Sequence, residues 1–317
     1  MEQSKKITEG ALLIGIYVVL LFIVMFVPII GFFGIFALPI PFIIYTSRHD
    51  YVPAILMLIV AIFLSLIFAT IVSLPLTLLA GIGGIFVGAS IYKKLSPYET
   101  LARGSLGFII GFVLIILLLQ FVLNINIYQE IDLFIQESLN MSKLMMEQMG
   151  FVDENANQQL KLIEDQMNSF KDLLPSSIAI VSMFFAFISQ WLSYKILNRI
   201  DQKKLAFPPF KNLNFPIAIL WFYFFAVIFS LIELDPSSGM YLVIANVLAL
   251  ITVFITIQGY SFIFYYADYK KLHKAVPISI LIISLIIPFL FMFIIRIIGI
   301  IDLGFSLKQR LASSSKK

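Results

Sequence analysis

Long runs of apolar residues alternate with short polar segments along almost the whole chain. A helix that crosses the hydrocarbon core of a bilayer needs ~20 mostly apolar residues. Seven runs approach or exceed this length, at residues 10–27, 51–72, 74–92, 104–123, 176–197, 215–234 and 240–266. The pattern therefore predicts an all-α fold, a polytopic bundle of transmembrane helices.

Two further apolar runs are irregular. Residues 29–45 contain Pro39 and Pro41, and this run predicts a discontinuous helix because proline removes a backbone donor and disrupts the preceding turn. Residues 276–301 are interrupted by Pro288 and carry Arg296. This last run predicts one tilted crossing, a re-entrant hairpin or an interfacial segment, so the expected number of spans is eight or nine.

The segment over residues 125–175 breaks the apolar pattern. It holds three lysines and nine acids, namely Glu130, Asp132, Glu137, Glu147, Asp153, Glu154, Glu164, Asp165 and Asp172. Apolar residues recur in it at three- and four-residue spacing, which places them on one face of a helix. The segment predicts an acidic helical hairpin. Its apolar stripes either bury each other or form a docking surface for a partner.

Composition excludes a soluble protein. Of the 317 residues, 61% are hydrophobic and only 13% are charged, against about 25% charged residues in average soluble domains. The chain has no cysteine, which excludes disulfides, a thiolate nucleophile and cysteine-ligated zinc. We therefore expect the lipid bilayer to be the main surroundings of the chain.

The distribution of basic residues sets the expected orientation. Lysine and arginine collect on cytoplasmic loops. With a cytoplasmic N-terminus, the inner loops receive fourteen of them and the outer loops before the last run receive only Lys143, Lys161 and Lys171. The bias predicts that residues 125–175 are extracytoplasmic. Five more basic residues, including Lys308 and Arg310, lie near the end of the last apolar run or after it. They favour a return of the chain to the cytoplasmic side.

These patterns suggest four regions. Residues 1–124 form an N-terminal transmembrane half and residues 125–175 the acidic hairpin. Residues 176–301 form a C-terminal transmembrane half, and residues 302–317 a basic tail.

Candidate substrate-binding positions lie where the membrane helices are interrupted, glycine-rich or polar. Broken backbone at membrane depth is tolerated where it lines a cavity, and ionisable residues there are functional candidates. The positions are Pro39, Pro41, Gly84, Gly88, Asn246, Arg296 and Asp302. We expect Arg296 and Asp302 to pair across a bend at Gly299. The few polar groups within the spans favour a small, weakly charged ligand.

Small residues four positions apart let membrane helices approach closely. In the first span these are Ala11 and Gly15, which predict a docking face for another membrane protein. No serine, histidine and acid constellation or nucleotide-binding signature is present in the sequence. We therefore expect no enzymatic activity, no catalytic residue, no metal or other cofactor, and no nucleic-acid partner.

Short motifs at both ends resemble the YybS family of uncharacterised membrane proteins from Bacillus-type bacteria. They are the run from Lys6 to Leu13, the Leu38–Phe42 break, and the run from Arg296 to Asp302 followed by Arg310. The resemblance extends over nearly the whole chain. It implies a bacterial source, and so a multi-pass protein of the bacterial plasma membrane, but no biochemical activity.

A more distant likeness is to the substrate-binding components of energy-coupling-factor transporters. These have a small-residue stripe on the first span that docks a partner, and they have no ATPase of their own. The sequence thus favours a transporter, or a substrate-binding transport component, for a small molecule. The alternative is a non-catalytic scaffold or sensor whose extracytoplasmic hairpin binds a partner protein.

Overall fold

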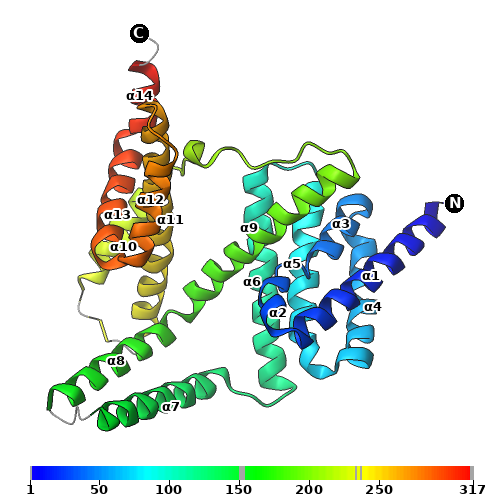
Figure 1. Cartoon of the computed structure of the whole chain (residues 1–317), viewed down its shortest axis with the longest axis horizontal. Helices are drawn as coiled ribbons and strands as arrows, with labels where there is room; N and C mark the ends of the chain where they lie inside the picture. The colour runs from blue at the N-terminus through cyan, green and yellow to red at the C-terminus, as the bar shows by residue number, and fades with distance from the viewer. Residues whose placement is uncertain (1, 150–153, 233, 236–237, 315–317) are drawn as a thin grey trace. The chain divides into compact units, whose positions relative to one another are not determined.

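The computed structural model describes residues 2–149, 154–232, 234–235 and 238–314, which form helices and no β-strand (Figure 1). The predicted all-α class is confirmed. In chain order the elements are α1 (Glu2–Phe26), α2 (Pro28–Gly34), α3 (Ile40–His49), α4 (Tyr51–Ala69), η1 (Ile71–Ser73), α5 (Leu74–Tyr92), α6 (Pro97–Phe121), α7 (Ile127–Gln148), α8 (Glu154–Asp172), α9 (Leu174–Ile200), η2 (Phe210–Asn212), α10 (Ala218–Ser230), α11 (Gly239–Tyr269), α12 (Ala275–Ile286), α13 (Pro288–Phe305) and α14 (Leu307–Ser314).

Seven segments of the described chain are helices long and apolar enough to cross a membrane. They are α1, α4, η1 with α5, α6, α9, α11 and α13. Two shorter apolar helices accompany them, α10 with 13 residues and α12 with 12 residues. Together these helices agree roughly with the expected eight or nine spans.

The chain folds into two compact units. Unit 1 comprises residues 1–171 and 177–206, and unit 2 comprises residues 172–176 and 207–317. These boundaries differ from the expected ones, because nearly all of α9 belongs to unit 1. Its Phe185 ring packs 4.7 Å from the ring of Phe36, which precedes α3.

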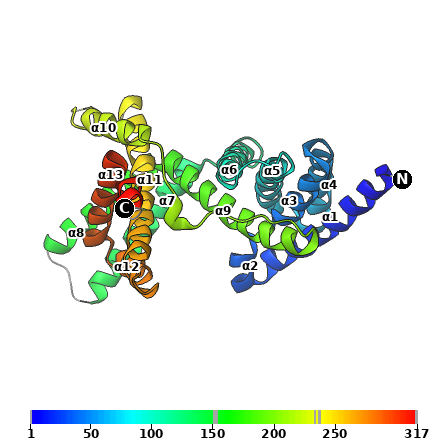
Figure 2. The ribbon, with the colours of Figure 1, turned by 90° about the horizontal axis from the view of Figure 1, so that it is seen from above.

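Helix α3 forms the core of unit 1. All residues from Ile40 to Ser47 are buried, and α1, α4 and α5 lie around the helix (Figure 2). A helix that is apolar on all of its faces is buried inside a bundle and not at its surface. Pro39 and Pro41 stand at its start, where a missing backbone donor costs little. Because α2 ends at Gly34 and α3 begins at Ile40, the predicted discontinuity is confirmed.

The last apolar run is a helical hairpin. It breaks at Ile287 into α12 and α13, both of which lie along α11 (Figure 1). Helix α12 begins just after α11 ends, and the hydroxyl of Tyr265, near that same end, donates to the backbone oxygen of Lys308 at 3.1 Å. Both ends of the run therefore lie at one end of α11. Of the three expected arrangements for this run, the structure therefore has the hairpin, whose two ends lie on the same side.

Two helices, α7 and α8, form the acidic segment. Asn126 caps α7 by accepting from the backbone N–H of Tyr128 at 3.0 Å. An ion pair of 2.5 Å joins Lys171 of α8 to Asp132 of α7. The apolar stripes do not bury each other in the described residues, because Phe134 is 65% exposed and Phe170 is 70% exposed. Both helices thus present open apolar faces.

Candidate functional site

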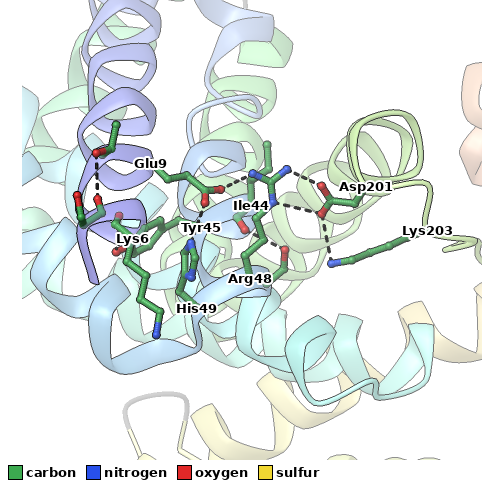
Figure 3. A network of polar contacts seen from close by, with 11 residues as sticks. Lys6, Glu9, Ile44, Tyr45, Arg48, His49, Asp201 and Lys203 are labelled. Atoms are coloured by element: carbon green, nitrogen blue, oxygen red, sulfur yellow. Dashed lines mark hydrogen bonds and ion pairs between the residues drawn. The ribbon is translucent and has the colours of Figure 1, made fainter. Parts of the chain in front are cut away.

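A cluster of charged side chains surrounds the C-terminal end of α3 (Figure 3). Arg48 donates to both carboxylate oxygens of Asp201, with 2.5 Å from Nη2 to Oδ1 and 3.2 Å from Nε to Oδ2. Its Nη1 also pairs with the carboxylate of Glu9. The second oxygen of that carboxylate lies 2.8 Å from Nε2 of His49. We call Glu9, Arg48, His49 and Asp201 the Arg48 cluster.

The Arg48 cluster joins three segments of unit 1 that are distant in sequence. Glu9 lies in α1, Arg48 and His49 end α3, and Asp201 directly follows α9. Basic residues at a helix C-terminus also complement the helix dipole. Arg48 is 26% exposed and both carboxylates are 17% exposed. The cluster therefore holds α1, α3 and α9 together at a partly solvated end of unit 1.

Asp201 makes the Arg48 cluster sensitive to acid. Burial works to raise the pKa of its carboxyl, but the hydrogen bonds and charge of Arg48 outweigh burial and hold the pKa below the ordinary 3.8. A carboxyl whose pKa is lowered by folding contributes stability that is fully present above the pKa of the unfolded state. This contribution is lost as pH falls through the pKa of the folded state. The stabilisation is therefore lost progressively as pH falls from about 3.8 toward the lower pKa of the folded state.

We expect Asp201→Asn to lower the melting temperature at about pH 6 and to melt like the wild type once Asp201 is protonated. Thermal unfolding in a mild detergent across this range measures the difference. Asp268→Asn is the matched control, because Asp268 pairs with Lys211 but is 62% exposed. A difference between Asp201→Asn and wild type that stays constant down to low pH contradicts the assignment.

A second cluster is buried in unit 2. Oδ2 of Asp302 in α13 accepts from Nε2 of Gln258 in α11 at 2.5 Å and lies 3.6 Å from Nζ of Lys308 in α14. Lys308 Nζ also donates to the backbone oxygen of Leu213 at 2.6 Å and to the hydroxyl of Ser261 at 2.7 Å. Gln258, Ser261, Asp302 and Lys308 form what we call the Asp302 cluster.

The Asp302 cluster is almost fully removed from solvent. The Asp302 side chain is 1% exposed and that of Lys308 is 10% exposed. Burial lowers the pKa of the Lys308 ammonium, and the neighbouring Asp302 opposes this shift only in part. A buried charge is tolerated only when it is paired and hydrogen-bonded. The two groups neutralise each other, and they fix α13 and α14 against α11.

The expected pairing of Arg296 with Asp302 is wrong. Asp302 bonds Gln258 and Lys308 instead, and the buried Nε of Arg296 has no hydrogen-bond partner in the described residues. Gly299 does not bend the chain but lies within the continuous helix α13. Lys308 reaches Asp302 because Ser306 adopts a left-handed conformation, with φ 50°, which turns α14 back.

The structure brings Pro39 together with the glycines of α5. A Cβ added to Gly84 would lie 2.8 Å from the Pro39 backbone oxygen, and one added to Gly88 would lie 2.8 Å from that of Ile43. Pro41 is buried in the first turn of α3. The void beside Pro39 and Ala80 is too small for a water molecule. Pro39, Gly84 and Gly88 therefore lie in close packing between the start of α3 and α5.

Asn246 belongs to neither cluster and has partners for both its side-chain oxygen and its side-chain nitrogen. Its Oδ1 accepts from the backbone N–H of Ser176 at 2.8 Å. Its Nδ2 donates to the backbone oxygens of Asp172 and Leu242, each at 2.8 Å. In unit 2 this residue thus secures the junction between α8 and α9.

The predicted docking face on α1 is open. A Cβ added to Gly15 would meet no atom within 4 Å. Ala11 and Gly15 line a groove of about 370 Å³ between α1 and α4, opposite Leu56 and Val60. A helix with small side chains at its contact face has room to approach α1 there.

Seven of the eight members of the two clusters were not predicted as site residues, namely Glu9, Arg48, His49, Asp201, Gln258, Ser261 and Lys308. Arg48 is 39 residues from Glu9 and 153 from Asp201, so no local spacing reveals their contact. One usable signal was Glu9 itself, because an acid at the start of an apolar span is costly unless it is paired. The pairing of Lys308 with Asp302 depends on the left-handed conformation of Ser306, which the sequence pattern does not predict.

The helical bundle, with seven helices of the described chain long and apolar enough to cross a membrane, defines an integral membrane protein that crosses the bilayer several times. The chain belongs to the family described as "Predicted membrane protein (DUF2232)", which it matches over residues 15–303.

A full-length relative is the uncharacterized protein YybS of Bacillus subtilis (strain 168). It is 31% identical over 314 residues, which cover 98% of this chain and 99% of the relative. The resemblance seen in the terminal motifs is thereby confirmed. No solved structure matches the chain.

Proposed function

We propose that this chain is a non-enzymatic, substrate-binding component of a membrane transport assembly for a small, weakly charged molecule. The observation that carries the proposal is the open face of α1, where Gly15 has no neighbour within 4 Å of an added Cβ. Together with the groove beside α4, this face offers a membrane-spanning partner a close backbone approach.

The likeness to substrate-binding components of energy-coupling-factor transporters supports this assignment. In those proteins the small-residue stripe of the first span docks a partner, and Ala11 and Gly15 occupy the same span here. No catalytic step, cofactor or nucleic acid is part of the proposal.

The substrate site in this proposal lies between α3 and α5, at Pro39, Pro41, Gly84 and Gly88. These helices pack directly against each other and leave no space for a water molecule. In this proposal a substrate therefore enters only when α3 moves away from α5. The Arg48 cluster holds the end of α3 and is the contact that such a movement breaks.

Site-directed cross-linking tests docking through α1. The chain has no cysteine, so Gly15→Cys provides one attachment point for a photoactivatable maleimide in native membranes. We expect a covalent adduct with a second membrane protein, identified by mass spectrometry. Leu106→Cys is the control, because this residue of α6 is 55% exposed but lies outside the groove. Equal adducts from both positions, or none from Gly15→Cys, contradict the proposal.

Gly15→Leu separates docking from folding. Because the position is open, we expect a leucine to leave the melting temperature within about 1 °C of wild type, since exposed substitutions rarely exceed ±0.5 kcal/mol. The adduct from a second probe on the same face, Ala11→Cys, then falls at least severalfold. An unchanged adduct shows that the α1 face is not the docking surface.

The exposed apolar faces of α7 and α8 favour a second candidate function, a scaffold or sensor that binds an extracytoplasmic partner. Methionine side chains make such faces adaptable, and Met141 and Met145 are both more than half exposed. Phe134→Cys, probed in the same way as Gly15→Cys, discriminates the two functions. Adducts with an extracytoplasmic protein from Phe134→Cys alone favour the scaffold.

A further inference from the structure

A second groove, of about 530 Å³, opens on unit 1 between α4, α5 and α6. Its wall is mostly apolar, and its lining includes Ser90 and two basic residues, Lys93 and Arg103. Tyr51, which also lines the groove, begins α4 two residues after α3 ends at His49, so the groove lies at the same end of unit 1 as the Arg48 cluster. Its apolar members are Ile55, Leu58, Ile82, Ile85, Phe86 and Ala89.

The two basic side chains flank the connection between α5 and α6. Lys93 directly follows α5, and Arg103 lies in the second turn of α6. Both are exposed. The nearby acid Glu99 is engaged in the capping box of α6, where its Oε2 accepts from the backbone N–H of Ser96 at 2.9 Å. The groove thus combines positive charge at a helix end with an apolar wall that continues along the spans.

We propose that this groove binds an anionic phospholipid, with its phosphate between Lys93 and Arg103 and an acyl chain along Ile55 and Phe86. Basic pockets between transmembrane helices are suited to lipid phosphates, and lysine and arginine at span ends lie at headgroup depth. An acyl chain gains the apolar contact that the exposed side chain of Ile55 offers. This inference is independent of docking through α1, because the two grooves share no residue.

The apolar wall favours a lipid over a free phosphate ion. An inorganic phosphate meets only the two basic groups and leaves the long wall uncovered. A lipid covers both parts of the groove at once. The occupant must therefore carry a negative headgroup and a hydrocarbon chain, and each of these contributes separately to affinity.

Native mass spectrometry of the full chain in neutral detergent tests the proposal. The protein is titrated with dioleoyl phosphatidylglycerol and, in parallel, with dioleoyl phosphatidylcholine. We expect retention of the anionic lipid at concentrations where the zwitterionic lipid is not retained. The double variant Lys93→Gln/Arg103→Gln is expected to lower the affinity for phosphatidylglycerol roughly tenfold to thirtyfold, since each basic group near an anionic lipid contributes about fivefold.

Two matched variants keep the result interpretable. Lys5→Gln/Lys204→Gln removes the same charge from exposed residues outside the groove and is expected to bind phosphatidylglycerol as wild type does. Ile55→Trp fills the groove at a 46%-exposed position without changing charge, and we expect it to weaken binding severalfold. Far-ultraviolet circular dichroism confirms that each variant is folded.

Three results overturn the proposal. One is equal retention of phosphatidylcholine and phosphatidylglycerol by the wild type. Another is an equal loss of affinity in the groove variant and in the control charge variant. The third is displacement of the lipid by millimolar inorganic phosphate, which assigns the site to a free anion.

Discussion

Gly259→Ala is expected to separate α11 from α13 and to destabilise unit 2 by about 3 kcal/mol, the upper end of the range for overpacked cores. An added Cβ on Gly259 would lie 2.0 Å from the backbone oxygen of Ile295, and one on Gly299 would lie 2.1 Å from that of Ile255. In each case the clash is with backbone, which cannot rotate away as a side chain does. The whole helix must move.

Thermal unfolding in a mild detergent measures this effect. For a chain of 317 residues, 3 kcal/mol corresponds to a fall in melting temperature of roughly 4–5 °C, because the entropy of unfolding is about 2.1 cal/mol/K per residue. Gly299→Ala is expected to act in the same way. The double variant Gly259→Ala/Gly299→Ala should lose less than the sum of the two, because one displacement of α13 relieves both clashes.

The matched control is Gly239→Ala. Gly239 is the first residue of the same helix α11, and an added Cβ there meets no atom within 4 Å. We expect this variant to melt as the wild type does or slightly higher, since alanine favours a helix. If Gly259→Ala also melts as the wild type, the close approach of α11 and α13 does not hold unit 2 together.

Sequence patterns predicted the bundle well because hydrophobicity alone determines which segments enter the membrane. The break at Pro39, the acidic helices and the irregular last run follow from proline, charge and periodicity, which are all local properties. The return of the last run was one of several open arrangements. The left-handed backbone conformation of Ser306 and the long-range hydrogen bond of Tyr265 select the hairpin among these arrangements, and neither is a local property of the sequence.

The polar clusters were harder to predict for the same reason. Asp302 is prominent in the sequence because it is an acid beside an apolar run, and it is indeed buried. Its partner was misassigned to Arg296, which is near in sequence, whereas Gln258 lies 44 residues away. Spacing along one helix does not show which of several polar groups a neighbouring helix brings close.

Lys308→Met is expected to destabilise the chain by about 3 kcal/mol, because removing one partner of a buried pair leaves the other charge uncompensated. Asp302 then retains the amide of Gln258 and the backbone N–H of residue 308, at 3.2 Å, but no cation. The backbone oxygen of Leu213 and the hydroxyl of Ser261 also lose a donor. The melting temperature in detergent reports the loss.

A double-mutant cycle distinguishes loss of the ion pair from loss of packing. Asp302→Asn/Lys308→Met removes both charges and keeps an acceptor for Gln258, so it is expected to recover at least about 1 kcal/mol relative to the sum of the single variants. Lys211→Met is the control in the same unit. The ion pair of Lys211 with Asp268 has a short distance of 2.6 Å, but it is exposed to solvent. Exposed pairs contribute at most about 1 kcal/mol. Strictly additive single variants, or a Lys308→Met cost no greater than that of Lys211→Met, contradict an energetic coupling between Asp302 and Lys308.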